Sequence, residues 1–191
     1  SSAASDVYKR QINNAVGSYL FVSDSEFTGN SSKSHGGALY SRGAMSVFGS
    51  IFTNNYTTTT NGDGEAGGSA IMSSVDAISY IGSSEFYGDK TNTLNTAQYG
   101  NAIMITGKSV LVDNSKFVGN SVSNRGGAIY GNGPSLTIYG STFNENSAKQ
   151  GGAVGIIGAS YPIILDSVFT SNTSQAEGGA IFYSTSTEGR R

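Results

Sequence analysis

Short apolar runs recur along the chain, and each is bounded by Gly, Ser, Asn or Asp. The runs are rich in β-branched and aromatic residues, and no apolar period of 3.6 residues survives between the glycines. They therefore predict short strands rather than amphipathic helices. One β-branched position returns six times, always five residues before a Phe, and we expect this column to face inward. The column consists of Val22, Val47, Ile81, Val112, Ile138 and Ile164.

A six-residue phrase, Ser-x-Phe-x-x-Asn or Asp, also returns six times, and a Gly-x-Ala-aliphatic motif follows every copy. The phrase occupies residues 25–30, 50–55, 84–89, 115–120, 141–146 and 167–172. The second motif begins at Gly36, Gly68, Gly100, Gly126, Gly151 and Gly178. Two motifs that recur in phase indicate stacked repeats, none of which buries its apolar face alone.

The repeat is too short for paired helices. Phe117, Phe143 and Phe169 follow one another at intervals of 26 residues, less than the period of tetratricopeptide, ankyrin or HEAT units. A turn-prone residue stands three positions before each Phe and should bend the chain between two strands. This turn column consists of Asp24, Gly49, Ser83, Asn114, Gly140 and Asp166. We therefore predict an all-β fold, a single-stranded parallel β-helix or solenoid of about six to seven coils.

Stacked coils place equivalent side chains above one another at a spacing of about 4.8 Å. An internal ring stack should form from Phe27, Phe52, Phe86, Phe117, Phe143 and Phe169. An amide ladder, in which each side chain donates to one neighbour and accepts from the other, should form from Asn30, Asn55, Asn120, Asn146 and Asn172. Asp89 holds the equivalent position in the third copy. Because a carboxylate cannot donate, we expect the ladder to break there unless a water, a cation or a protonated acid fills in.

The pairing of Gly-Gly-Ala-aliphatic with Phe-x-x-Asn resembles the repeats of the chlamydial polymorphic outer membrane proteins. The resemblance spans residues 19–183, and the second and third copies depart from it, with Ser69 and Asn101 in place of the middle Gly. It implies a right-handed parallel β-helix that is displayed on the cell surface as an autotransporter passenger and acts as an adhesin.

Composition narrows the classes of partner. The chain has 191 residues, no Cys, 13% charged residues and a net charge of −2. Its stability therefore does not depend on disulfides or thiolate-bound metals, and it lacks the basic surface of a nucleic-acid-binding protein. It has no apolar run of about eighteen residues, so we expect no membrane-spanning helix. We expect an extracellular or cell-surface location, with attachment to the outer membrane through a region absent from this sequence.

The chain is expected to divide into three segments. Residues 1–11 match no repeat, and we expect them to be an unstructured or artefactual leader. Residues 17–184 should form the β-helix, as a fragment of a larger protein. Residues 185–191 should be an uncapped tail beyond the last strand.

Candidate catalytic groups are sparse. His35 is the only histidine, and its neighbours in the sequence supply neither a triad nor a metal site. Glu26, Glu85 and Lys116 share the position before the Phe, where strand alternation should point them to solvent. We therefore expect no catalytic residue, no cofactor and no bound metal.

Two neighbouring copies are lengthened between the Asn or Asp position and the Gly motif. These segments, residues 56–67 and 90–99, hold twelve and ten residues, whereas the other four copies hold four or five. Insertions on one face of a solenoid commonly build its binding surface, although insertions without a ligand are the alternative. The candidate ligand contacts are Tyr56, Thr58, Asp63, Glu65, Lys90, Asn92, Gln98 and Tyr99. Asp63 and Glu65, with Asp89 nearby in the stack, also offer oxygen ligands for Ca²⁺, but their spacing matches no defined loop motif.

Two functional classes fit the sequence. The first is a non-catalytic, surface-exposed β-helix, an adhesin or structural passenger segment whose partner is a host-cell or matrix protein or a glycan. The alternative is a carbohydrate-active enzyme of the polysaccharide lyase or hydrolase type, which needs carboxylates and a cation converging in one groove. Ice binding is a third option, but it requires regular Thr on a flat face, and the run at residues 57–60 lies in a loop.

Overall fold

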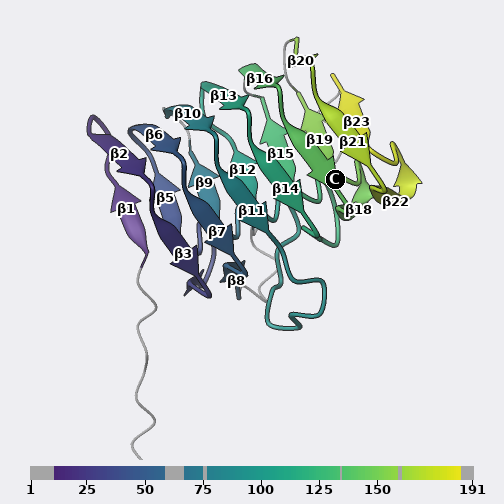
Figure 1. Cartoon of the computed structure of the whole chain (residues 1–191), viewed down its shortest axis with the longest axis horizontal. Coiled ribbons are helices and arrows are strands. Elements are labelled where there is room, and N and C mark those ends of the chain that lie inside the picture. Colours follow the sequence, from purple (N-terminus) through teal and green to yellow (C-terminus); the bar gives the residue numbers. More distant parts are fainter. Residues whose placement is uncertain (1–10, 59–66, 75–76, 134, 159–160, 186–191) are drawn as a thin grey trace, which may run out of the picture.

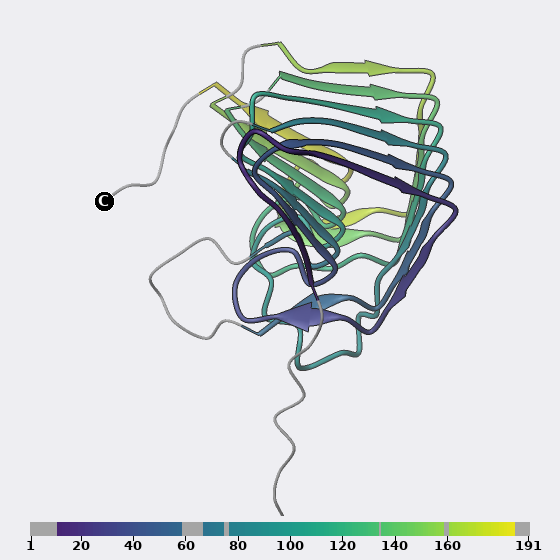
Figure 2. The ribbon, with the colours of Figure 1, turned by 90° about the vertical axis from the view of Figure 1, so that its left-hand side faces the viewer.

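The computed structural model describes residues 11–58, 67–74, 77–133, 135–158 and 161–185. Every regular element in these ranges is a strand, and strands of successive coils pair in parallel. The coils follow one another from β1 to β23 (Figure 1), and Figure 2 shows them superimposed, with the sheets on different sides of the stack. The parallel β-helix expected from the repeats is confirmed.

Three long sheets run along the stack; six successive coils contribute one strand to each sheet, and sheet A has a seventh strand, β23. Sheet A contains, in order, β1 (Ile12–Asn14), β5 (Leu39–Ser41), β9 (Ile71–Ser73), β12 (Ile103–Ile105), β15 (Ile129–Asn132), β19 (Val154–Ile157) and β23 (Ile181–Ser184). Sheet B contains β2 (Tyr19–Ser23), β6 (Ala44–Phe48), β10 (Ile78–Gly82), β13 (Ser109–Asp113), β16 (Ser135–Tyr139) and β20 (Ile163–Leu165).

Sheet C carries the Phe column, and its register is set by the repeat. It contains β3 (Glu26–Thr28), β7 (Ile51–Thr53), β11 (Glu85–Tyr87), β14 (Lys116–Val118), β17 (Thr142–Asn144) and β21 (Val168–Thr170). Two short pairs follow the Asn position, β4 (Ser31–Ser32) with β8 (Tyr56–Thr57) and β18 (Ser147–Gln150) with β22 (Thr173–Glu177). Equivalent positions pair directly, so Phe86 lies between Phe52 and Phe117.

The core contains a single file of Phe rings beside a file of β-branched residues, together with the aliphatic residues of sheet A. Successive ring centroids are 4.7–4.9 Å apart, and the planes lie within 6° of parallel. The four inner rings, from Phe52 to Phe143, are at most 1% exposed. Phe27, Ile164 and Phe169 are only partly buried, because each lies in an end coil and is covered from one side.

Left-handed backbone forms the corners between the sheets. All six residues of the turn column have φ between 44° and 57°, a region that Gly, Asn and Asp tolerate better than other residues. The first Gly of each Gly-x-Ala-aliphatic motif also has a left-handed backbone, with φ between 48° and 65°, at the corner before sheet A. The recurring turn residues are therefore required by two corners in each coil.

The Ser of the repeated phrase forms a ladder that sequence reasoning left without a role. In the first five copies, the backbone N–H of the Ser donates to the Oγ of the Ser in the next coil, at 3.1–3.2 Å. Each hydroxyl then donates to the carbonyl two residues before it. The members are Ser25, Ser50, Ser84, Ser115, Ser141 and Ser167. The sequence signal for this ladder is the Ser that opens the phrase in all six copies.

The first coil begins earlier than the expected boundary at residue 17. Strand β1 pairs with β5, and Ile12 lies opposite Leu39. Gln11 Nε2 also donates to the carbonyl of His35 at 2.8 Å. Residues 11–16 therefore belong to the β-helix, and residues 1–10 and 186–191 lie outside the described residues.

Candidate functional site

The Asn column lies at the inner edge of the connection between sheets C and A, where it links successive coils. Asn146 accepts at Oδ1 from both the backbone N–H and the Nδ2 of Asn120, at 3.0 and 3.1 Å. Its own Nδ2 donates to Asn172 Oδ1 at 2.9 Å and to the carbonyl of Phe117 at 3.1 Å. The ladder therefore satisfies backbone groups as well as amides.

The ladder breaks at the third coil, where Asp89 turns toward its own loop. Asp89 Oδ1 accepts from the backbone N–H of Thr91 at 2.8 Å and from its hydroxyl at 2.6 Å. Both hydrogen bonds lower the pKa of Asp89, and the one from the hydroxyl has the larger effect. Asn30 still donates to Asn55 at 3.0 Å, so the first two coils retain their link.

Asn101, which replaces the middle Gly of the second motif, restores the link to the fourth coil. Its Nδ2 donates to Asn120 Oδ1 at 3.3 Å, and its Oδ1 accepts from Asn95 at 2.5 Å. A Cβ on Gly88 would lie 2.9 Å from Asn101 Nδ2, so a Gly at position 88 makes the space for this side chain. Two departures from the repeat, Asp89 and Asn101, therefore compensate each other within one coil.

The middle Gly of the second motif lies where the backbone of the next coil comes close. A Cβ on Gly127 would lie 2.7 Å from the backbone nitrogen and oxygen of Ser147, in the next coil. Ser69 occupies the equivalent position in the second coil, which is followed by the ten-residue segment 90–99. Its hydroxyl donates to Asn95 Oδ1 at 3.0 Å. Ser69 is therefore buried against the segment 90–99 and bonded to it.

The two lengthened segments lie against each other where they leave the stack. Thr96 donates to the carbonyl of Thr57 from its backbone N–H at 2.9 Å and from its hydroxyl at 3.1 Å. Ala97 packs with Val122 and Ala148 in a small apolar cluster. Residues 90–99 form the teal loop beside β8 in Figure 1. The base of this loop is therefore part of the folded structure.

The candidate contact residues divide into buried, partly buried and exposed ones. Tyr56 is 8% exposed, and Thr58 is partly buried and donates to the carbonyl of Ser32. Lys90 is exposed, whereas Asn92 and Gln98 are partly buried.

Two further candidates, Asp63 and Glu65, lie outside the described residues. Tyr99 packs its ring at 4.5 Å from that of Tyr130, and its hydroxyl accepts from Asn124 at 2.8 Å. Burial and these contacts assign Tyr56 and Tyr99 to the structure of the loop base, which leaves Lys90 as the most exposed of the described candidates.

A small polar cluster lies on the outer side of sheet C. Lys116 Nζ is 3.1 Å from the Tyr87 hydroxyl and 4.0 Å from Glu85 Oε2, and Tyr87 also donates to Glu85. The hydrogen bond with Tyr87 raises the pKa of Lys116, and the negative charge of Glu85 adds a smaller effect in the same direction. Glu26, Glu85 and Lys116 share one outward column, and the latter two are about half-exposed at their side chains.

His35 is partly buried against Tyr40, with ring centroids 6.2 Å apart. Within the described ranges, no group of three or more His, Cys, Asp or Glu residues is placed to hold a metal ion. The same ranges contain no helix that is long and apolar enough to cross a membrane.

Three segments of the chain match the family model of the Chlamydia polymorphic membrane protein repeat, at residues 24–42, 114–132 and 166–184. Each match runs from the turn column through the Phe phrase to a strand of sheet A. The matched copies share the full Gly-Gly-Ala motif and a five-residue connection. No curated protein and no solved structure gives a significant match. Three of the six copies are therefore similar to the Chlamydia polymorphic membrane protein repeat.

Proposed function

We propose that the protein is a non-catalytic β-helix displayed outside the cell or on its surface, where it serves as an adhesin or structural passenger segment. Its partner is a host-cell or matrix protein or a glycan. The observation that carries this proposal is the contact between the two lengthened segments, through Thr57 and Thr96. The family repeat supports the location, since its name refers to membrane proteins.

The segment 90–99 has the form of a contact surface on a fixed base. Its base is held by the Thr57 contact and by the packing of Ala97. Its tip is shaped by two side-chain turns, in which Asp89 accepts from Thr91 and Asn92 accepts from the backbone N–H of Leu94 at 3.0 Å. Leu94 is 60% exposed at this tip. A preorganised tip loses little conformational entropy when it binds.

Substitution at the tip tests this proposal without disturbing the base. We expect the double variant Lys90→Ser and Leu94→Ser to bind cells, matrix proteins or a glycan array about tenfold more weakly, as for a residue pair of moderate hot-spot strength. The fold should be unchanged, because both side chains are exposed. The measurement is titration of the labelled chain, with circular dichroism as the check on folding.

The matched control is Lys149→Ser, because Lys149 is an exposed Lys in the short connection of the fifth copy. This variant should bind like the original chain. Equal binding by the tip variant would contradict the proposed contact surface. Cleavage of a polysaccharide by the intact chain would instead establish the enzyme alternative.

A further inference from the structure

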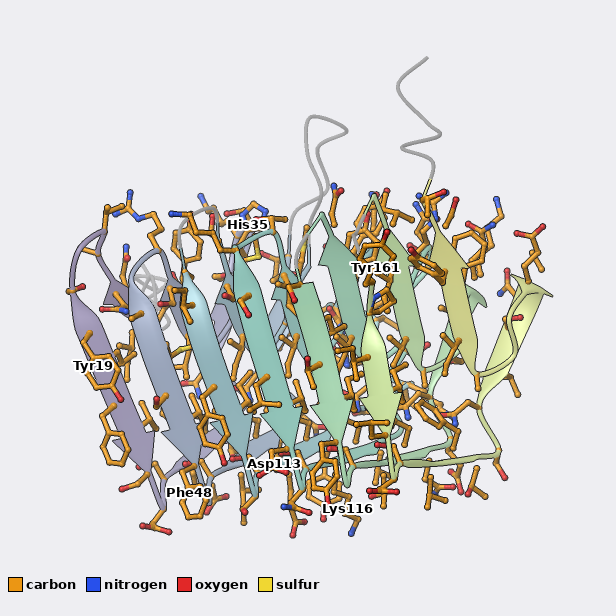
Figure 3. All side chains as sticks on the ribbon, turned by 90° about the horizontal axis from the view of Figure 1, so that it is seen from above. Tyr19, His35, Phe48, Asp113, Lys116 and Tyr161 are labelled. Atoms are coloured by element: carbon orange, nitrogen blue, oxygen red, sulfur yellow. The ribbon has the colours of Figure 1, made fainter. Side chains whose placement is uncertain are left out.

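One column of residues runs along the corner where the connections from sheet C enter sheet A. Parallel pairing aligns, in successive coils, His35, Gly67, Tyr99, Arg125, Gln150 and Glu177. Figure 3 shows His35 on the upper side of the stack and Lys116 on the lower side, so this column lies away from the polar cluster of sheet C. Its last three members form a connected set, which we call the charged row (Arg125, Gln150 and Glu177).

The side chains of the charged row hold one another in place. Arg125 Nε donates to Gln150 Oε1 at 2.7 Å, and Gln150 Nε2 donates to Glu177 Oε2 at 2.8 Å. The amide of Gln150 therefore stands between the positive and the negative charge and fixes the direction of both side chains. Side chains that are already ordered lose little conformational entropy when a ligand binds.

Gly155 allows Arg125 to lie across the outer side of sheet A. A Cβ on Gly155 would lie 3.2 Å from Arg125 Cβ, so the stem of Arg125 passes directly over this glycine. Gly155 pairs with Phe182 in the next coil, and the guanidinium carbon of Arg125 lies 5.9 Å from the centre of the Phe182 ring. The partly buried guanidinium therefore lies beside an aromatic ring.

The two ends of the charged row keep hydrogen-bonding groups that the described part of the chain does not use. A guanidinium carries several N–H donors, and the Nη groups of Arg125 make no hydrogen bond or ion pair with the described residues. Glu177 is exposed, and its Oε1 accepts no hydrogen bond from those residues. A fork of donors and an acceptor oxygen thus remain available on either side of Gln150, close to Phe182.

Donors and acceptors side by side match the chemistry of a neutral sugar. Each sugar hydroxyl both donates and accepts, so neighbouring hydroxyls can accept from the guanidinium and donate to the carboxylate at the same time. The apolar face of a sugar ring can pack on Phe182. The opposite charges of Arg125 and Glu177 offset each other, which weakens the attraction that Arg125 alone would exert on an anion. A bound peptide helix would instead need several apolar anchors, and this site offers one ring.

We propose that Arg125, Gln150, Glu177 and Phe182 form a binding site for a neutral glycan. The charged row contacts the sugar hydroxyls, and Phe182 supports one face of a sugar ring. The inference rests on the binding role proposed above, but it does not depend on the tip of the segment 90–99. A sugar that covers only these four side chains binds weakly, with a Kd of about 1 mM.

Solution NMR of the full chain tests the site, because it detects weak binding and shows which side chains are contacted. The probes are neutral cello-, malto-, manno- and galacto-oligosaccharides, with an oligogalacturonate as the acidic counterpart. At about 10 mM of a neutral probe that binds, the Nε–H signal of Arg125 and the side-chain amide signals of Gln150 should shift. The oligogalacturonate should leave these signals unchanged.

Arg125→Met removes the guanidinium but keeps a stem that covers Gly155. This variant should bind the neutral probe about tenfold more weakly, because the donor fork is lost. The matched control is Lys149→Met, which removes an exposed positive charge beside Gln150 in the chain but outside the charged row. The control should bind like the original chain. If Arg125→Met changes the circular dichroism spectrum, Glu177→Gln takes its place, because Glu177 is exposed and should also weaken binding when its charge is lost.

Three results would overturn the proposal. The first is that no neutral probe shifts the signals of Arg125 and Gln150. The second is that a folded Arg125→Met chain, or the Glu177→Gln chain in its place, binds the probe as well as the original does. The third is that only the oligogalacturonate shifts the signals, which would assign the guanidinium to an acidic ligand.

The double variant Lys90→Ser and Leu94→Ser separates this proposal from the contact surface at the loop tip. It should show the same probe-induced shifts as the original chain, because neither substitution touches the charged row. Shifts that persist while the variant binds cells normally would refute the tip and support the glycan site. Weaker cell binding by the variant, with no probe-induced shift in either chain, would support the tip and refute the glycan site.

Discussion

Phe117→Ala is expected to lower the free energy of unfolding by about 3–5 kcal/mol, as for other buried aromatic residues cut back to Ala. The ring is fully buried and stacks between Phe86 and Phe143 at 4.8 and 4.7 Å. The cavity cannot close easily, because the Ser and Asn ladders on either side fix the spacing of the coils. For a chain of this length, the loss corresponds to a fall of about 6–20 °C in Tm.

Val118→Ala is the matched control for this loss. Val118 is the next residue in the same strand, but it points outward and is only partly buried. The control should cost less than about 1 kcal/mol. Urea denaturation followed by circular dichroism measures both variants. A Phe117→Ala chain with the same midpoint as the control would show that the ring stack does not hold the coils together.

Asn146→Ala is expected to cost about 2–4 kcal/mol, although it removes only a small polar group. Asn146 is fully buried, and its side chain takes part in four hydrogen bonds, with Asn120, Asn172 and the carbonyl of Phe117. Its loss leaves the backbone N–H of Asn120 and the carbonyl of Phe117 buried without these partners, and each such group costs about 1–3 kcal/mol. The neighbouring ladder members cannot span the gap of one coil.

The control for this substitution is Asn144→Ala, two residues earlier. Asn144 lies on the outer side of sheet C and makes one long contact, to Glu145 at 3.4 Å. Its loss should change the stability by less than about 0.5 kcal/mol. Equal urea midpoints for the two variants would mean that a ladder Asn stabilises the protein no more than a surface Asn does.

The sequence predicted the architecture because each repeated residue performs one structural task in every coil. Phe86 and Phe117 meet in the core, and Asp24 and Gly140 turn corners with φ of 46° and 57°. The Ser ladder escaped prediction for a different reason. Its acceptor is a side chain, but its donor is a backbone N–H, and an alternation of side chains along a strand does not reveal where backbone donors point.

The candidate site was less predictable, because loop length says where a segment leaves the stack and not how it folds back. Tyr56 belongs to the short strand β8, and Tyr99 packs on Tyr130. Asn101 looked like a departure from the motif, yet its amide donates to Asn120, as a ladder Asn at position 89 would do. Such compensation depends on three-dimensional proximity between two motifs, which neither motif shows by itself.

The ladders also determine how such a protein can change its length in evolution. Most coils offer the same Ser, Phe and Asn contacts to the coil before and the coil after, so a gene duplication of one 26-residue unit, such as that from Phe117 to Phe143, would create a junction that already fits. The third coil is different, because its Asn101 is matched to Asp89 and Gly88 in the same coil. Recombination can therefore copy or delete whole coils here, but it must carry the third one as an intact unit.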